Sequence, residues 1–386
     1  QAVLARAPGR RAGCARASAS SGPAMAVGDV RALPKGHLHY HLEPCMRPGT
    51  LDALCAKYGV DRAADPLMNV PRNYPTFDDF QDAVVSVCFK TIREREDVAR
   101  IVMEMAEDAA QQGVCYLEPA FGMGTLLAER WGVPERSVWD VLFSAGRAAQ
   151  DRYGVLVRWM VPAVRTWDPR LAEGTARLAA EMAAAGEPVV SFGLHASEGA
   201  TLDGKGPFPP GPFAEAFRIA ADAGLISTPH AGEFLGPESC RAAVEELRAD
   251  RLQHGVRACE DPATLELLRG RRVCCDVCPT SNVLLNVVPS IERHPLPTLI
   301  NAGVPCTINV DDSLMFGPSI VDEYEAARGR LGLSDAQLRG CARHSLAYSG
   351  LMLRAQRGFA DREGVAFLES KLDAIDAWGL EGGPLM

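Results

Sequence analysis

Two histidines, His39 and His41, are separated by a single residue in a short apolar run. Alternate side chains of a β-strand point to the same face, so both imidazoles reach one side of such a strand. Neutral imidazole is the commonest metal ligand among side chains and binds Zn²⁺ well. Taken alone, this pair is a weak signal for a metal site, and two ordinary strand histidines explain it better. His37 shares the same face, and we expect it to be a buried structural group.

Three later β-rich runs also end in histidine or aspartate. His230 ends one run, His254 ends the next, and the pair Asp311-Asp312 ends the last. Each of these has an ordinary explanation by itself, such as helix capping by Asp312. Four separate runs with such endings are harder to explain in that way. In barrel enzymes the carboxyl ends of the strands form the rim that carries the active site.

These groups could form a mononuclear zinc site, which needs three or four nitrogen or oxygen ligands and one open position. Zinc lowers the pKa of bound water from about 15.7 to about 7 and so supplies hydroxide at neutral pH. The predicted ligands of one Zn²⁺ per chain are His39, His41, His230 and Asp311. The groups left near them as acid, base and substrate anchors are Glu233, His254 and Asp312.

The elements that position these residues alternate between β-rich runs and helical segments. The eight β-rich runs are residues 36–42, 113–119, 155–164, 188–194, 224–228, 251–254, 272–278 and 305–310. The clearest helical segments are residues 77–112, 212–223, 237–247 and 262–270. This alternation predicts parallel pairing through crossovers, and eight units close into a (β/α)8 TIM barrel of the α/β class. A doubly wound open sheet would favour a glycine-rich turn after the first strand, where His41-Leu42-Glu43-Pro44 stands instead.

We expect residues 29–386 to form this single domain, with a C-terminal helix beyond about Leu353. Residues 1–28 carry several arginines, no acidic group and a Ser/Ala run. This composition is typical of a leader: either an organelle transit peptide or read-through sequence ahead of Met25. We expect that segment to be disordered and to contribute nothing to the fold.

Charge and composition limit the class of partner. The net charge of −9 has the wrong sign for binding phosphate backbones, which excludes nucleic acid. No apolar stretch approaches the roughly 20 residues of a membrane span. The 12 cysteines are too few for a disulfide scaffold and favour a reducing compartment. We therefore expect a small-molecule partner and a cytoplasmic location, or an organelle if residues 1–28 are a transit peptide. Oligomeric state is left open.

A group of motifs, in order and spacing, resembles the adenosine deaminase family of metal-dependent hydrolases. The motifs are Leu33-Pro34-Lys35, His39-Tyr40-His41-Leu42-Glu43, His230-Ala231-Gly232-Glu233, His254-Gly255, Cys278-Pro279-Thr280-Ser281-Asn282 and Asp311-Asp312. The resemblance runs from about residue 33 to residue 353. Within it, residues 224–262 are most similar to actinobacterial adenosine deaminases.

The resemblance implies zinc-dependent attack on C6 of a 6-aminopurine nucleoside, adenosine or deoxyadenosine, with inosine-type product and ammonia, in purine salvage. It assigns the zinc to the four ligands above. Glu233 protonates the ring nitrogen N1, and His254 orients and deprotonates the attacking water. Asp312 accepts a hydrogen bond at purine N7, the backbone N–H of Ala196 meets N3, and Glu43 stands beside the ribose.

The match departs from the family on the sugar side of the site. Pro44 replaces a usual glycine, and Ser313 replaces a usual proline. Leu194-His195-Ala196-Ser197-Glu198 stands where many members read Leu-Ala-Gly-Asp-Glu. Glu43 replaces an aspartate, as in adenine-directed relatives. Deamination of adenine or of an N6-modified AMP is therefore an alternative.

Other readings are possible. Binuclear barrel hydrolases often need a carboxylated lysine at the end of the fourth strand, and residues 189–197 contain no lysine. A non-catalytic purine-binding relative would have lost a ligand or the acid, and here none is missing. We interpret Cys275 and Cys278 as core groups of a strand, and His294 and His344 as structural or surface groups.

Overall fold

The computed structural model describes residues 28–199, 204–359 and 361–378. The predicted leader, residues 1–28, lies outside the described residues except for Gly28. No helix within the described ranges is both long and apolar enough to cross a lipid bilayer.

Within the described residues, nine parallel strand segments form the centre of the fold. Each overlaps one of the eight predicted runs, although the strand in run 224–228 continues to Ala231. The segments are β1 (Lys35–His37), β2 (Val114–Leu117), β3 (Leu156–Val157), β4 (Trp159–Val164), β5 (Val189–His195), β6 (Ile226–Ala231), β7 (Arg251–His254), β8 (Cys274–Val277) and β9 (Cys306–Ile308). β3 and β4 are two parts of one predicted run, interrupted at Arg158. The strands pair in the order β1-β2-β3 and β4-β5-β6-β7-β8-β9.

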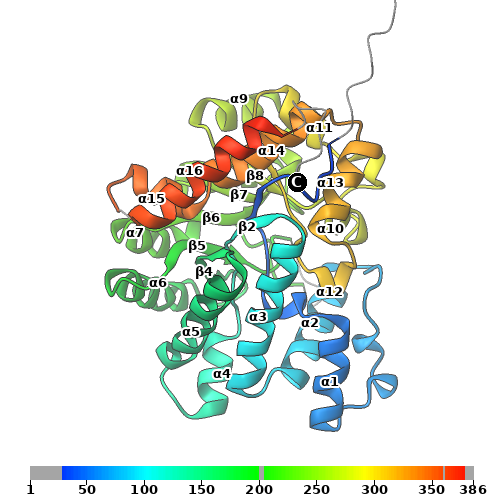
Figure 1. Cartoon of the computed structure of the whole chain (residues 1–386), viewed down its shortest axis with the longest axis vertical. Helices are drawn as coiled ribbons and strands as arrows, with labels where there is room; N and C mark the ends of the chain where they lie inside the picture. Colours follow the sequence, from blue (N-terminus) through cyan, green and yellow to red (C-terminus); the bar gives the residue numbers. More distant parts are fainter. Residues whose placement is uncertain (1–27, 200–203, 360, 379–386) are drawn as a thin grey trace, which may run out of the picture.

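Isolated bridges join these two sheets at both edges. Tyr40 pairs with Asp311, which links the continuation of β1 to that of β9. Ala120, just after β2, pairs with Met160 of β4. The ring is therefore closed, and the predicted (β/α)8 barrel is confirmed. Figure 1 shows the strands at the centre of the molecule with the helices around them.

The helices cover the outside of this barrel. They are α1 (Pro48–Tyr58), α2 (Phe77–Thr91), α3 (Arg95–Gln111), α4 (Gly124–Trp131), α5 (Glu135–Tyr153), α6 (Pro169–Ala184), α7 (Ala214–Asp222), α8 (Pro237–Glu246), α9 (Pro262–Arg271), α10 (Pro279–Leu284), α11 (Leu296–Asn301), α12 (Ser313–Phe316), α13 (Ile320–Gly329), α14 (Asp335–Ala347), α15 (Gly350–Gln356) and α16 (Arg362–Ala377). The helix predicted over residues 77–112 is two helices, because Glu94 and Asp97 form a capping box that starts α3. The predicted C-terminal helix is also a pair, α15 and α16.

The barrel interior contains a buried ionic network. Arg251 donates from Nη2 to Glu118 (2.7 Å) and from Nε to Asp276 (2.7 Å), and all three side chains are fully buried. The backbone oxygen of Asp276 lies 3.0 Å from Nδ1 of His39. Asn309 accepts hydrogen bonds from the backbone N–H groups of Leu38 and His39. This polar core therefore fixes the residues at the end of the first strand.

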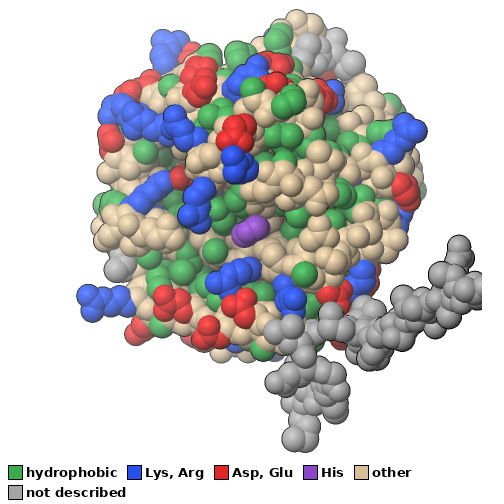
Figure 2. All heavy atoms as spheres, turned by 90° about the horizontal axis from the view of Figure 1, so that it is seen from above, with side chains coloured by type: hydrophobic (Ala, Val, Ile, Leu, Met, Phe, Trp, Pro, Cys, Tyr) green, Lys and Arg blue, Asp and Glu red, His purple; other side chains and the backbone are tan. Residues whose placement is uncertain are grey.

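One face of the molecule is drawn with its side chains in Figure 2. On that face, basic and acidic side chains are interspersed among the described residues.

Candidate active site

The four predicted zinc ligands come together at the carboxyl ends of the strands. Nε2 of His39 and Nε2 of His41 lie 3.2 Å and 3.1 Å from the same oxygen, Oδ1 of Asp311. His230 belongs to β6, which is separated from β9 by β7 and β8. The four side chains offer donor atoms that all lie within 4.8 Å of one another. They enclose a space that one small cation could occupy.

Several donor atoms of these four groups are buried, and the pKa values of three of the groups are shifted. Nε2 of His39, Nδ1 of His230 and Oδ1 of Asp311 are buried and have no hydrogen-bond partner among the described residues. Burial lowers the pKa of His230 well below its usual value, which keeps it neutral. Burial alone would raise the pKa of Asp311, but the neighbouring histidines outweigh it and hold that pKa well below its usual range. Burial alone would lower the pKa of His39, but the neighbouring Asp311 outweighs it and raises that pKa. Imidazole nitrogens and one carboxylate form a donor set typical of catalytic zinc.

A second donor set overlaps with the first. Cys278 and His254 could share a metal with His39 and Asp311, again with all donor atoms within 4.8 Å. The sequence interpretation placed Cys278 in the core; it is fully buried, but it also borders the site. Burial raises the pKa of the Cys278 thiol well above its usual value. Because the thiolate is the form that binds metal, the nitrogen and oxygen set is the better one.

Glu233 and His254 lie next to each other at this centre. Oε1 of Glu233 is 3.4 Å from Nε2 of His254, which in turn is 3.9 Å from Oδ2 of Asp311. Burial raises the pKa of Glu233 well above its usual range, and the charges of Asp311 and Glu198 raise it further. Burial lowers the pKa of His254. At neutral pH the pair is therefore an uncharged carboxylic acid beside an uncharged imidazole.

The loop that carries Glu233 is held by Glu198, to which the sequence analysis assigned no role. The buried carboxylate of Glu198 accepts hydrogen bonds from the backbone N–H groups of Gly232 (3.1 Å), Glu233 (2.8 Å) and Phe234 (3.0 Å). It also accepts one from the Ser239 hydroxyl (2.5 Å). The sequence offered one signal for this role, because Glu198 is the glutamate that ends the motif at residues 194–198. This contact ties the end of β5 to the loop after β6.

Asp311 is held by two further residues that sequence reasoning missed. The Ser281 hydroxyl donates to Oδ2 of Asp311 (2.7 Å), and the Cys45 thiol donates to its backbone oxygen (3.2 Å). The thiol sulfur also accepts from the backbone N–H of Ser313 (3.2 Å). A proline has no N–H, so the departure at Ser313 adds a hydrogen bond beside the predicted ligand.

Two of the predicted substrate-binding residues, Asp312 and Glu43, are buried and lie near enough for their charges to interact. Asp312 is buried, and both burial and the charge of Asp311 raise its pKa well above the usual range. Oε1 of Glu43 accepts from the backbone N–H groups of Gly122 (2.6 Å) and Met123 (2.8 Å). Burial raises the pKa of Glu43 to about 7.

His195, another departure from the family pattern, adds a further imidazole to the centre. Its ring centroid lies 4.6 Å from that of His41 and 4.7 Å from that of His230. Its Nε2 is buried without a hydrogen-bond partner among the described residues. A Cβ added at Gly193 would lie only 3.1 Å from that nitrogen. The glycine therefore makes room for the His195 ring.

Several site residues have strained backbones. Ala196, His254 and Asp311 have φ values of +76°, +76° and +71°, although none is glycine. Side chains disfavour this left-handed region, so the surrounding contacts must hold these residues there. The strain coincides with three of the predicted site positions.

The remaining histidines take structural positions. His37 accepts at Nε2 from the backbone N–H of Val310 (3.1 Å), which agrees with the expected structural role. His344 contacts the backbone of Cys306 through Nδ1. His294 is buried and hydrogen-bonded to Asn282, whose other end reaches His254.

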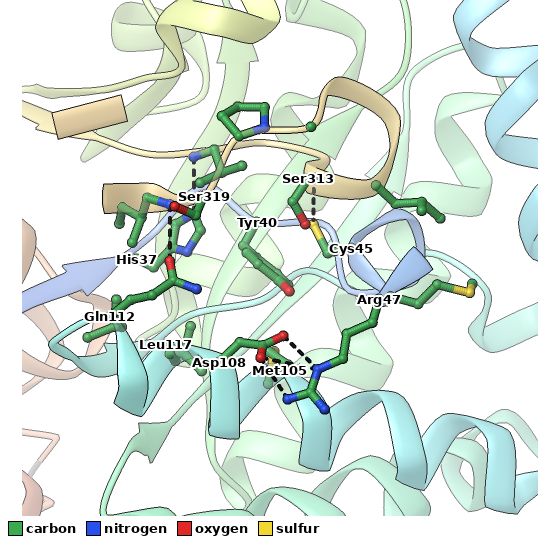
Figure 3. Close-up of a pocket in the computed structure, with 18 of the residues that line it drawn as sticks. His37, Tyr40, Cys45, Arg47, Met105, Asp108, Gln112, Leu117, Ser313 and Ser319 are labelled. Atoms are coloured by element: carbon green, nitrogen blue, oxygen red, sulfur yellow. Dashed lines mark hydrogen bonds and ion pairs between the residues drawn. The ribbon is translucent and has the colours of Figure 1, made fainter. Parts of the chain in front are cut away.

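A cavity of about 270 Å³ lies beside the site and is shown in Figure 3. Its walls include Tyr40, Cys45, Asp108 and Ser313, and Arg47 forms an ion pair with Asp108 across one side. None of the four predicted zinc ligands lines it. This cavity is therefore separate from the cluster of histidines.

Comparison with known proteins gives consistent matches. A family model described as adenosine deaminase matches residues 34–362. A putative adenosine/adenine deaminase of Streptomyces coelicolor is 39% identical over 334 residues, 83% of this chain and 92% of the relative. An aminodeoxyfutalosine deaminase of the same organism is 35% identical over 352 residues, 90% of this chain and 86% of the relative. The crystal structure of an Arabidopsis N6-mAMP deaminase superposes with a TM-score of 0.72 at 26% identity, covering 89% of this chain and 99% of that one.

Proposed function

The chain belongs to the adenosine deaminase family of hydrolases that act on amidine C–N bonds, and from this premise we propose that it deaminates a 6-aminopurine nucleoside in a zinc-dependent reaction. Adenosine and deoxyadenosine are the proposed substrates, with inosine or deoxyinosine and ammonia as products. One observation carries the proposal: the donor atoms of four side chains converge, with an uncharged Glu233 and His254 beside them. The four proposed ligands are His39, His41, His230 and Asp311.

The donor set fits zinc, because a cation among these buried atoms would supply the partner that they lack. When bound, a zinc ion supplies hydroxide at neutral pH by acidifying water. Nδ1 of His39 donates to the backbone oxygen of Asp276, and this bond turns Nε2 inward as the ligand atom. Ser281 holds the carboxylate of Asp311, and Cys45 holds its backbone oxygen.

Glu233 is the proposed acid. A carboxyl group that stays protonated at neutral pH can donate its proton to N1 of the purine. Protonation of N1 draws electrons from C6 and makes that carbon the site of attack. Glu198 aims Glu233 by holding the backbone of its loop. His254, through Nε2, faces the same space and orients the attacking water.

Asp312 has the proposed contact with N7, but in the opposite sense to the one expected from the sequence. The raised pKa of Asp312 keeps its carboxyl protonated. N7 of a purine is a hydrogen-bond acceptor. The carboxyl therefore donates to N7 instead of accepting from the purine. The backbone N–H of Ala196 is proposed to meet N3, and the Glu43 carboxyl is proposed to meet a sugar hydroxyl.

Adenine and N6-modified AMP are the second candidates. Glu43 and His195 differ from the residues usual in adenosine deaminases. Glu43 is a proposed substrate contact, and the His195 ring lies beside the ring of the proposed zinc ligand His41. Relatives of this chain include proteins described as adenosine/adenine, aminodeoxyfutalosine and N6-mAMP deaminases. The chemistry at C6 is common to all of these substrates.

The test is ammonia release by the zinc-loaded protein across a substrate panel. The panel contains adenosine, deoxyadenosine, adenine, AMP, N6-methyl-AMP and 6-amino-deoxyfutalosine. Turnover of adenosine and deoxyadenosine above the others supports the proposed substrates, and preference for another member replaces them. Release from none of the six, by protein with one zinc bound, contradicts the proposal. Glu233→Ala is the control, which should bind zinc and release no ammonia.

A further inference from the structure

A line of three buried side chains runs from His254 away from the site. Nδ1 of His254 lies 3.2 Å from Nδ2 of Asn282, and Oδ1 of Asn282 lies 3.1 Å from Nε2 of His294. The backbone N–H of Leu296 then donates to Nδ1 of His294 (3.1 Å). All three side chains are almost completely buried, so solvent does not complete these hydrogen bonds.

The backbone end of this line fixes the direction of every hydrogen bond in it. A backbone N–H can only donate, so Nδ1 of His294 must accept and its proton must be on Nε2. That Nε2–H donates to the oxygen of Asn282, which leaves the amide NH₂ facing His254. Because an NH₂ group also only donates, Nδ1 of His254 carries the lone pair. The proton of the neutral His254 ring is therefore on Nε2.

The opposite arrangement leaves a clash. If the Asn282 amide were flipped, its NH₂ would face His294, whose Nε2 would then have to accept. The proton of His294 would move to Nδ1 and point at the N–H of Leu296, donor against donor. In a buried site such a pair costs about 1–3 kcal/mol, because neither donor finds a partner. Only the first arrangement, with the Asn282 NH₂ facing His254, gives every group a partner. The four groups are the Leu296 N–H and the side chains of His294, Asn282 and His254.

We infer that His294 is a positioning residue which, through Asn282, holds His254 in the tautomer with the proton on Nε2. That N–H points into the space bordered by Glu233, 3.4 Å away, and Asp311, 3.9 Å away. The tautomer follows from the hydrogen bonds alone, whereas its effect on catalysis rests on the proposed function.

The consequence concerns what His254 can do to the attacking water. A neutral imidazole with its proton on Nε2 donates a hydrogen bond from that atom and has no lone pair there to receive a proton. His254 then orients the water by donating to one of its lone pairs. The deprotonation of water by His254, which the family resemblance implies, would need the other tautomer.

The first test reads the tautomer directly. The zinc-loaded protein is labelled with ¹⁵N-histidine, and long-range ¹H–¹⁵N spectra distinguish a protonated ring nitrogen from one with a lone pair. The His254 signals are assigned as those lost in His254→Ala. We expect a lone pair at Nδ1 and a proton at Nε2. A proton at Nδ1 of the wild-type His254 overturns the inference. This readout needs no substrate, so it stands even if the proposed deamination fails.

Three variants test the line itself. In Asn282→Asp, a carboxylate accepts from both neighbours, and the His254 proton should move to Nδ1. His294→Phe removes both nitrogens at similar size; kcat should fall about 10- to 100-fold with little change in KM. His294→Gln returns an N–H donor near the position of Nε2 and should recover most of kcat. An unchanged His254 tautomer in His294→Phe, or a loss in His294→Gln as large as in His294→Phe, overturns the inference. Bound zinc and circular dichroism confirm that each variant is folded.

Discussion

Oε1 of Glu233 lies 3.4 Å from Nε2 of His254, and the two residues come from the ends of the adjacent strands β6 and β7. Burial favours the uncharged form of both, because it raises the pKa of the carboxyl and lowers that of the imidazole. The barrel thus places an uncharged carboxyl beside a neutral ring, at the edge of the cluster of candidate metal ligands. Acid catalysis at neutral pH depends on that combination.

The role of Glu233 predicts a selective loss in Glu233→Gln. The amide keeps the size and a hydrogen-bond donor but cannot transfer a proton, so kcat for ammonia release should fall about 10²- to 10⁴-fold. Zinc content, measured by atomic emission, should stay at the wild-type level. A variant with near-normal kcat would show that the proton for N1 comes from another group.

The donor set predicts one zinc per chain. Chelation should abolish ammonia release, and added Zn²⁺ should restore it. His230→Ala removes one of the four converging donors and should lower bound zinc, whereas Cys278→Ser leaves all four intact and should retain it. Loss of zinc in Cys278→Ser but not in His230→Ala would instead identify the overlapping set that contains Cys278. Two zinc ions per chain would indicate a binuclear hydrolase.

The backbone of Ala196 predicts a stabilising substitution. Its φ of +76° costs a side-chain-bearing residue about 1 kcal/mol that glycine avoids. Ala196→Gly should therefore raise the free energy of unfolding in urea by roughly this amount. Ala185, which ends α6 with φ of −74°, is the matched control, and Ala185→Gly should be destabilising. Equal destabilisation by both substitutions would contradict the predicted backbone strain at Ala196.

The buried carboxyl of Glu43 predicts a dependence of stability on pH. Its pKa is about 7 in the folded chain and near 4.5 when exposed, so folding favours its protonated form. The cost of burying its charge is absent below about pH 4.5, grows through the range between the two pKa values and is complete above pH 7. Glu43→Gln has no such charge. Between pH 5 and pH 8, wild type should lose about 3 kcal/mol of unfolding free energy relative to this variant. Parallel pH curves for the two proteins in urea unfolding would refute the shifted pKa.

The sequence was sufficient to predict the barrel because its strands are short apolar runs separated by helical segments. It was also sufficient to predict that four side chains converge, because parallel strands end at one rim. These are His39, His41, His230 and Asp311. Breaks inside elements were not predicted, such as the interruption between β3 and β4 and the division between α2 and α3. The second of these depends on a local capping box that the helical period of residues 77–112 obscures.

The hydrogen bonds that position the site residues could not be predicted from the sequence, for a different reason. Glu198 reaches a loop 34 to 37 residues later, and the line from His254 to His294 joins two segments that no sequence period relates. His294 was interpreted as a structural or surface histidine, because nothing in its local sequence points to the site. Such contacts depend on how the loops fold back over the rim, which only three-dimensional coordinates specify.

The most direct test of the account is an isotope experiment on the zinc-loaded protein. Adenosine, or whichever panel substrate turns over fastest, is supplied with ¹⁵N in its 6-amino group, in water enriched in ¹⁸O. Mass spectrometry of the products should find all of the released ¹⁵N as ammonia and one ¹⁸O at C6 of the purine product. Glu233→Gln should form neither product at a comparable rate. Release of free purine base with its amino group intact, or a product without ¹⁸O at C6, would contradict hydrolytic deamination at this site.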